Sequence, residues 1–373
     1  MGALMTVGAT AGPDAVPALS EAQVRRIVSH GPWPPPPQRD PSNRASGNTA
    51  AIAWGAKLFG EPRLSANGTV ACASCHRAEL GFADGLPKAR GLATADRNTP
   101  SVANARMQRW YGWDGAGDSL WAQSLRPMVD PREMGSDLVR IASAVRGNAD
   151  LEQGYRLAFG APPPADDEAL AVDVAKALAA FQETIDTGRT PFDDFRDALA
   201  RGDRAAAARY PPAAQRGLAI FIGKGRCDVC HVGARFSNGE FHDIGIPHFV
   251  GPGRVDAGRY EGIRRLQANR YNLLGPYNDD PTRRTAISTR HVASEHRNFG
   301  EFKVPSLRGV ARTAPYMHSG SLATLADVVR HYSEIDEDRL HADGERILKP
   351  LHLTASESAD LIAFLESLDD GAR

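Results

Sequence analysis

The chain has 373 residues, a formal net charge of −1 at pH 7 and a sequence pI near 6.8. A chain of this length suits two domains of ordinary size. The near-neutral charge argues against a nucleic-acid partner, and the lack of an apolar run of about 18 residues argues against a membrane span.

The N-terminal part, residues 1–50, is expected to form an irregular arm. Within it, Pro34 to Pro37 favour a stiff polyproline segment. Residues 1–18 match a secretory leader poorly, because their apolar stretch is short and no Lys or Arg precedes it. The first predicted helix covers residues 51–59 and leads toward a cysteine motif.

The cysteine motif is Cys72-Ala-Ser-Cys75-His76, and Cys227-Asp-Val-Cys230-His231 repeats it with the remaining two of the four cysteines. A C-x-x-C pair alone would also suit a zinc half-site or a redox dithiol. With a histidine directly after each pair, the spacing is typical of c-type haem, in which both thiols become thioethers and the histidine ligates iron. The sequence therefore predicts two covalently bound c-type haems.

The first haem iron is expected to be open on the face away from His76. The chain between Arg77 and Met107 holds neither His nor Met, so the usual nearby ligand is missing. A remote His or Met that closes this iron is the alternative.

Polar residues that could serve an open haem follow at Trp113-Asp-Gly115, Gln123 and Glu133-Met-Gly135. Cleavage of peroxide needs a proton moved from its inner to its outer oxygen, and a carboxyl group positioned by an amide can do this. By spacing alone, Gln123 and Glu133 would more often be surface residues.

The rest of the chain also favours helices and loops. A helix is predicted over residues 169–187, and a short apolar run at 218–222 precedes the second cysteine motif. Residues 251–298 are rich in Gly, Arg, Asn and Tyr and are expected to form long surface loops. A last helix is predicted from near Thr354, with Glu357 completing a capping box, to about Leu368.

The order of these motifs resembles the bacterial di-haem cytochrome c peroxidase and MauG family. The resemblance also rests on Arg97-Asn-Thr-Pro100, Phe302-Lys-Val-Pro-Ser-Leu-Arg308, Thr313-Ala-Pro-Tyr-Met-His318-Ser-Gly320 and Thr324-Leu325, and it covers roughly residues 50–335. It implies a mostly α fold with two c-type cytochrome domains, each a few helices around one covalent haem, with long loops.

The expected division follows from the same resemblance. The arm 1–50 precedes an N-terminal cytochrome domain, 51–205, with the peroxide-binding haem. A C-terminal cytochrome domain, 206–345, holds the second haem, and residues 346–373 form a helix that packs back on the body.

The resemblance assigns roles to individual residues. Gln123 and Glu133 match the pair above the peroxide-binding haem, and Trp113 matches the tryptophan between the haems. A calcium ion between the haems is implied, held by the Asn98 side chain and by the backbone carbonyls of Thr313 and Pro315. An oxygen-only, partly hydrated site is one that calcium accepts.

Tyr332 stands 14 residues after His318, where typical peroxidases of the family have a methionine. The predicted helix places it on one face with Leu325, Val328 and Val329. A tyrosine in such a stripe is usually core filling, and His331 and Met317 are rival ligands. With the family match, Tyr332 is expected to ligate the second iron opposite His231. An anionic oxygen ligand lowers the potential, which favours the MauG branch.

The expected function is that of a periplasmic di-haem oxidoreductase. It would use hydrogen peroxide to form a high-valent state shared by both haems and then oxidise a side chain of a partner protein. The alternatives are a cytochrome c peroxidase that takes electrons from a small donor cytochrome, and a non-catalytic electron-transfer protein. Gly225 stands where MauG has a relay tryptophan, and the tryptophans other than Trp113 are expected to pack.

Overall fold

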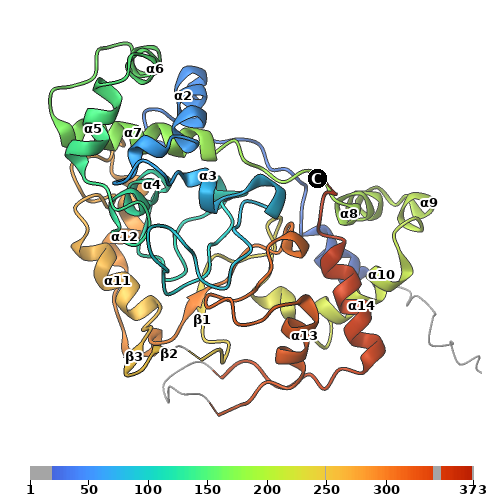
Figure 1. Ribbon diagram of the computed structural model, residues 1–373. Coiled ribbons are helices and arrows are strands. Elements are labelled where there is room, and N and C mark those ends of the chain that lie inside the picture. Colours follow the sequence, from blue (N-terminus) through green and yellow to red (C-terminus); the bar gives the residue numbers. More distant parts are fainter. Residues whose placement is uncertain (1–18, 248, 339–345, 372–373) are drawn as a thin grey trace, which may run out of the picture.

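The computed structural model describes residues 19–247, 249–338 and 346–371, and confirms a mostly helical fold (Figure 1). Residues 1–18, which match a secretory leader poorly, lie outside this part. Two short antiparallel pairs join β1 (Phe241–His242) to β4 (Phe302–Lys303) and β2 (Phe249–Gly251) to β3 (Arg254–Val255). Over the described ranges, no helix is long and apolar enough to cross a membrane.

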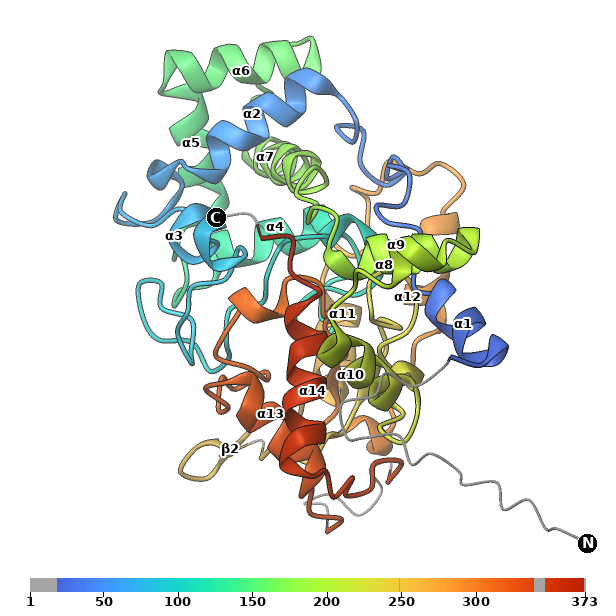
Figure 2. The same cartoon turned by 90° about the vertical axis from the view of Figure 1, so that its right-hand side faces the viewer.

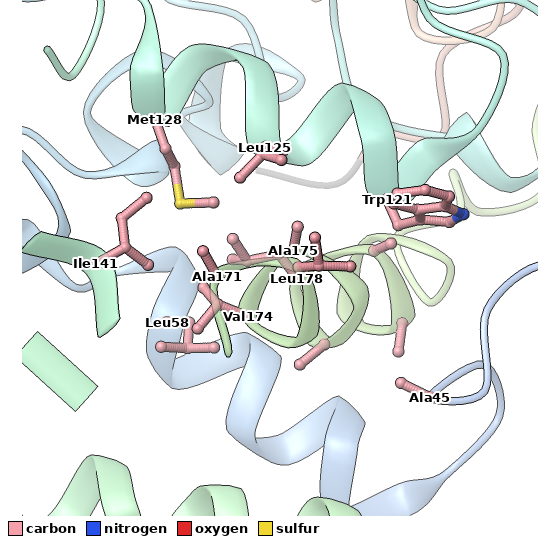
Figure 3. Close-up of a cluster of buried hydrophobic side chains, with 14 of the residues drawn as sticks. Ala45, Leu58, Trp121, Leu125, Met128, Ile141, Ala171, Val174, Ala175 and Leu178 are labelled. Carbon is pink, nitrogen blue, oxygen red and sulfur yellow. The ribbon is translucent and has the colours of Figure 1, made fainter. Parts of the chain in front are cut away.

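One group of helices surrounds α7 (Asp167–Gln182), which corresponds to the helix predicted over 169–187. The helices in contact with α7 are α2 (Thr49–Phe59), α4 (Leu120–Val129) and α5 (Leu138–Arg146), and α6 (Ala149–Phe159) packs against α2 and α5. Small residues let α2 and α7 approach closely: a Cβ at Gly55 would overlap the carbonyl oxygen of Ala177. Leu125 and Met128 of α4 face α7 from the other side (Figure 3). We call this apolar group the first cluster.

A second apolar group joins α8 (Pro191–Arg201), α10 (Pro212–Ile222), α13 (Leu325–Ser333) and α14 (Ala355–Glu366). Its centre is aromatic, because Phe192, Phe221, Phe236 and Phe364 are all buried and in ring contact. α14 is the predicted last helix, and Thr354 and Glu357 form the expected capping box. We call this group the second cluster; Figure 2 shows α14 lying along α10 and α13.

The N-terminal arm contains a helix that was not predicted, α1 (Glu21–Val28), capped by Ser20 and Gln23. α1 lies against the second cluster, where Arg26 pairs with Asp228 inside the second cysteine motif. Further along, Asn43 Nδ2 donates to the carbonyl of Lys176 on α7, at 3.0 Å. The arm therefore contacts both clusters.

The prediction of long surface loops over 251–298 is wrong for part of that segment. It contains α11 (Arg259–Ala268), which buries Ile263 and Leu266 one turn apart, so an apolar stripe stabilises it despite the polar composition. Gly262 fits α11 against the loop after Trp113, because a Cβ there would overlap the carbonyl of Asp114.

The remaining helical segments are α3 (Cys72–Cys75), α9 (Arg204–Ala207), α12 (Ile287–His291), and the 3-10 turns η1 (Pro62–Leu64), η2 (Ala78–Leu80), η3 (Ala105–Met107), η4 (Cys227–Val229), η5 (Arg284–Ala286), η6 (His296–Asn298) and η7 (Val310–Arg312). Two of them, α3 and η4, carry the cysteine motifs. Each follows a longer helix, α2 or α10, so the two motifs enter the fold in the same way.

Candidate active site

The first cysteine motif opens on a cavity of about 1060 Å³ that Cys72, Cys75 and His76 line together. His76 is held by a hydrogen bond of 3.0 Å between its Nδ1 and the carbonyl oxygen of Phe82. Burial lowers the pKa of His76, which keeps the ring neutral. With Nδ1 engaged, Nε2 is the nitrogen left to ligate an iron.

The second motif opens on a separate cavity of about 540 Å³, lined by Cys227, Cys230 and His231. His231 is held in the same way as His76. Its Nδ1 lies 2.9 Å from the carbonyl oxygen of Phe236. Burial lowers the pKa of His231 to about 4. The sequence analysis did not identify either of these carbonyl acceptors.

Phe82 and Phe236 share an unusual backbone, with φ of 61° and 53°. This left-handed conformation is rare for a bulky residue and turns each carbonyl back toward its histidine. A phenylalanine five or six residues after each motif histidine is the only trace of it in the sequence.

The donor set of each cavity fits a c-type haem. The four cysteines form no disulfide with one another, and burial raises the pKa of both Cys72 and Cys227 to about 12. Each cavity thus offers two thiols for thioether bonds and one neutral, tethered histidine for the iron. Among the described residues, no three or more His, Cys, Asp or Glu side chains form a competing metal cluster.

Gln123 and Glu133, predicted to lie above the first haem, both line the first cavity. Gln123 comes from α4, and its Oε1 atom is buried with no hydrogen-bond partner in the described part of the chain. Glu133 lies 3.5 Å from Arg126 and is 30% exposed. The lining also contains the buried Met134, which is the thioether closest in sequence to Glu133.

Trp113, which was predicted to lie between the haems, lines both cavities. Its Nε1 donates to the carbonyl of Asn98 at 2.9 Å. The next residue, Asp114, is buried and pairs with Arg97 at 2.7 Å and with Arg265. Burial raises the pKa of Asp114, but the two positive charges outweigh it and lower the pKa to about 2. The tryptophan therefore sits on a loop fixed by ion pairs.

The loop of Trp113 has a counterpart before α13. Tyr111 bridges to Gly117 just as Tyr316 bridges to Leu322. Both tyrosine hydroxyls donate to a carbonyl six residues earlier, Ala105 at 3.2 Å and Val310 at 3.1 Å. α4 follows the first turn and α13 follows the second.

The three residues predicted to hold calcium, Asn98, Thr313 and Pro315, all line the second cavity. Asn98 Nδ2 donates to the carbonyl of Leu86 at 2.8 Å, which leaves its side-chain oxygen as the atom for a cation. Amide and carbonyl oxygens are ligands that calcium accepts.

Tyr332 lines the second cavity together with Leu325, Val328 and Val329, the stripe predicted for this helix. Burial, and then the nearby Cys227 and Cys230, raise the pKa of its hydroxyl. The rival His331 does not line the cavity; its Nε2 lies 2.8 Å from the carbonyl oxygen of Ile244. The other rival, Met317, does line the cavity.

Gly225 also lines the second cavity, at the position of MauG's relay tryptophan. A Cβ there would lie 2.8 Å from the carbonyl oxygen of Ile220 and 3.2 Å from Cys227 Sγ. The local backbone has little room for a side chain at this point.

The chain is similar to a known protein family and to several of its members. The family model described as di-haem cytochrome c peroxidase matches residues 49–201. Methylamine utilization protein MauG of Methylorubrum extorquens is 37% identical over 322 residues, which cover 85% of this chain and 77% of that protein. Cytochrome-c peroxidase IdrP1 of Pseudomonas sp. (strain SCT) is 31% identical over 358 residues, covering 93% and 88%.

Among solved structures, a MauG-like protein associated with microbial copper homeostasis superposes with a TM-score of 0.68 at 28% identity. The match covers 91% of this chain and 96% of that one. Two cavities with the donor set of a c-type haem agree with these similarities, and the family implies two haems. The chain belongs to the di-haem cytochrome c peroxidase and MauG family of oxidoreductases.

Proposed function

We propose that this protein is a MauG-like enzyme, which reduces hydrogen peroxide in the first cavity with electrons from a side chain of a partner protein. Reduction of hydrogen peroxide to two waters takes two protons and two electrons. Oxidation of exposed tyrosine or tryptophan side chains of the partner would release both. When bound, the haems supply the redox chemistry, and the protein supplies protons, position and coupling.

Glu133 is the proposed proton carrier. It lines the cavity of His76 and is partly exposed to solvent, so its carboxylate can take a proton from one peroxide oxygen and return it to the other. Gln123 has an unpartnered, buried amide oxygen at the same cavity and would orient the peroxide. Trp113 would couple the two cavities electronically, because it lines both.

The observation that carries the MauG-like proposal is Tyr332 at the second cavity. It lines the cavity of His231, whereas His331 is engaged with a backbone carbonyl. A tyrosinate would stabilise the oxidised iron and lower its potential. Such a haem accepts electrons poorly from a donor cytochrome but suits storage of an oxidising equivalent.

Electron paramagnetic resonance of the ferric protein at low temperature tests this assignment. We expect one high-spin signal from the first haem and one low-spin signal from the second. Tyr332→Phe should change only the low-spin signal, and the control Met317→Leu should change neither. Two low-spin signals in the unaltered protein would contradict an open first iron and would point to Met134.

A cytochrome c peroxidase is the second candidate, and one observation favours it: Met317 also lines the second cavity. If Met317→Leu alters the low-spin signal while Tyr332→Phe does not, the second haem has a thioether ligand. Rapid peroxide turnover with a reduced small cytochrome would then be expected. The same measurement therefore separates the two candidates.

The calcium ion and the periplasmic location belong to the same proposal. Asn98, Thr313 and Pro315 at one cavity support an oxygen-liganded calcium between the haems, and one calcium per chain should be found by elemental analysis. Covalent haem attachment outside the cytoplasmic membrane supports the periplasm, which fractionation of cells would test.

A further inference from the structure

Two half-buried cations line the second cavity, and one of them also lines the first. Lys303 on β4 lines both cavities, and Arg235, four residues after His231, lines the second. Lys303 Nζ donates to Gln108 Oε1 and to the carbonyl of Trp110, which are both uncharged groups. Within the described residues, no carboxylate pairs with Arg235 or Lys303. The charge of Asp114 acts on Lys303 without forming an ion pair with it, and among those residues no carboxylate acts in this way on Arg235.

The charge of Arg235 also acts on Lys303. Burial lowers the pKa of Lys303 to about 7, and the positive charge of Arg235 contributes to that shift. Burial lowers the pKa of Arg235 as well, and the only other group that acts on it is Tyr111. A pair of like charges out of water is costly unless an anion lies between them.

Two buried arginines elsewhere in the protein have partners that offset the free energy lost when their charge leaves water. Arg308, which lines the same cavity, forms two hydrogen bonds of 2.8 and 2.9 Å with the carboxylate of Asp193. Arg259 donates to the carbonyls of Asp114 and Gly115 and lies between two aromatic rings. Arg235 has no comparable arrangement, so its guanidinium is set up for an anion that enters the cavity.

We propose that Arg235, with Lys303, forms a carboxylate-binding subsite for the propionate side chains of the porphyrin in the second cavity. A haem carries two carboxylates, and an arginine fork suits one of them. The inference rests on the placement of a haem at Cys227 and Cys230.

This subsite would also tune the second iron. A fixed positive charge nearby disfavours the additional positive charge of ferric iron, and therefore raises the reduction potential. Its effect opposes that of a tyrosinate from Tyr332. The potential of the second haem would then be set by two chain groups with opposite effects.

A redox titration of the holoprotein, followed by haem absorbance, tests the subsite. Because the haem is attached covalently, Arg235→Met should retain it, which haem staining of the peptide with Cys227 and Cys230 verifies independently. We expect Arg235→Met to shift the potential of the second haem downward, and Arg235→Lys to restore most of it. Arg140→Met removes an exposed positive charge on α5 and should leave the potential unchanged.

The pH dependence of the potential separates a carboxylate partner from a packing role. In the unaltered protein the cations keep the propionate ionised, and the ionised propionate in turn opposes the effect of burial on the pKa of Lys303, so the potential should be nearly constant between pH 5 and about 8. In Arg235→Met the propionate gains a proton more readily, so a slope should appear within that range. A potential and slope equal to those of the unaltered protein would overturn the proposal.

A free anion is the other source of a carboxylate. If Arg235 bound one, added acetate would shift the potential of the unaltered protein, and this would also overturn the proposal. If Arg235→Met fails to fold, Lys303→Met provides the same comparison, with the same downward shift expected. Absence of haem from the second motif would refute the placement itself, which is a distinguishable result.

Discussion

Glu133 illustrates how a single side chain combines access to solvent with access to the cavity. Its carboxylate is 3.5 Å from the guanidinium of Arg126, and both residues line the first cavity. A proton carrier has to take a proton from one peroxide oxygen and give it to the other while its own side chain stays in position. In the proposed role, the charge of Arg126 would hold the carboxylate in place, and the exposed part of the side chain would let it exchange protons with water.

Replacing Glu133 by glutamine should therefore slow the reaction with peroxide by about 100-fold or more, because an amide cannot accept the proton. Stopped-flow haem absorbance after mixing with peroxide measures this rate. Glu152→Gln, on the exposed face of α6, serves as the control and should react as the unaltered protein does. An unchanged rate in Glu133→Gln would remove Glu133 from the proposed mechanism.

Among the elements, the close crossing of α10 and α14 matters most for the second cavity, because α10 leads directly into Cys227. A Cβ at Gly217 on α10 would overlap the carbonyl oxygen of Asp360 on α14. The two helices can approach this closely only with glycine at that position. Arg216 and Asp360 add an ion pair of 2.8 Å at the same crossing.

Gly217→Ala should lower the free energy of unfolding by about 1–3 kcal/mol, since the added methyl group forces two packed helices apart. Urea unfolding followed by circular dichroism measures the change. At the control position, Gly60, a Cβ would lie 3.8 Å from its nearest neighbour, so Gly60→Ala should change stability little. Equal stability of both variants would show that the crossing tolerates more volume than the geometry implies.

The sequence alone predicted those elements that are specified by residues close together in the chain. The cysteine motifs, the apolar stripe that ends at Tyr332 and the capping box at Thr354 are all short-range patterns. α11 was missed because its polar composition hides two buried residues one turn apart. The carbonyl of Phe82 and the unpaired charge of Arg235 depend on backbone conformation and on distant neighbours, which no local pattern reports.

For the whole molecule, we propose that the two clusters represent the two cytochrome domains. Phe192 and Phe195 of α8 pack in the second cluster, although the expected boundary placed them in the first domain, 51–205. Leu273 and Ala286, expected in the second domain, 206–345, pack in the first cluster. We therefore propose that the domains meet near residue 186 and exchange a segment later in the chain.

Glu183 ties the N-terminal arm to α7 and makes stability depend on pH. Its Oε2 accepts from Ser46 at 2.6 Å, and its Oε1 is buried with no hydrogen-bond partner among the described residues. Burial raises the pKa of Glu183 to about 7, and the charge of Asp40 adds to the shift. Since the folded protein favours the protonated acid, the stabilising contribution is full below about pH 4.5 and is lost as pH rises through 7.

Glu183→Gln should remove this loss, because glutamine is uncharged at every pH. At pH 8 the variant should be more stable than the unaltered protein by up to about 3 kcal/mol, and at pH 4.5 the two should be similar. Urea unfolding at both pH values measures the difference. Glu334→Gln, at an exposed position, is the control. A variant less stable at pH 8 would contradict the assigned direction.

The matching turns at Tyr111 and Tyr316 allow the helices that follow them to be compared residue by residue. They align α4 with α13 position by position, so Gln123 corresponds to Val328 and Pro127 corresponds to Tyr332. All four of these residues line their own cavity. The two halves therefore share one arrangement, in which a bridged turn is followed by a helix that lines a cavity. Where one helix has a tyrosine hydroxyl, the other has a proline, which offers iron no ligand. Under the proposed ligation, this one helical position would distinguish a closed second haem from an open first one.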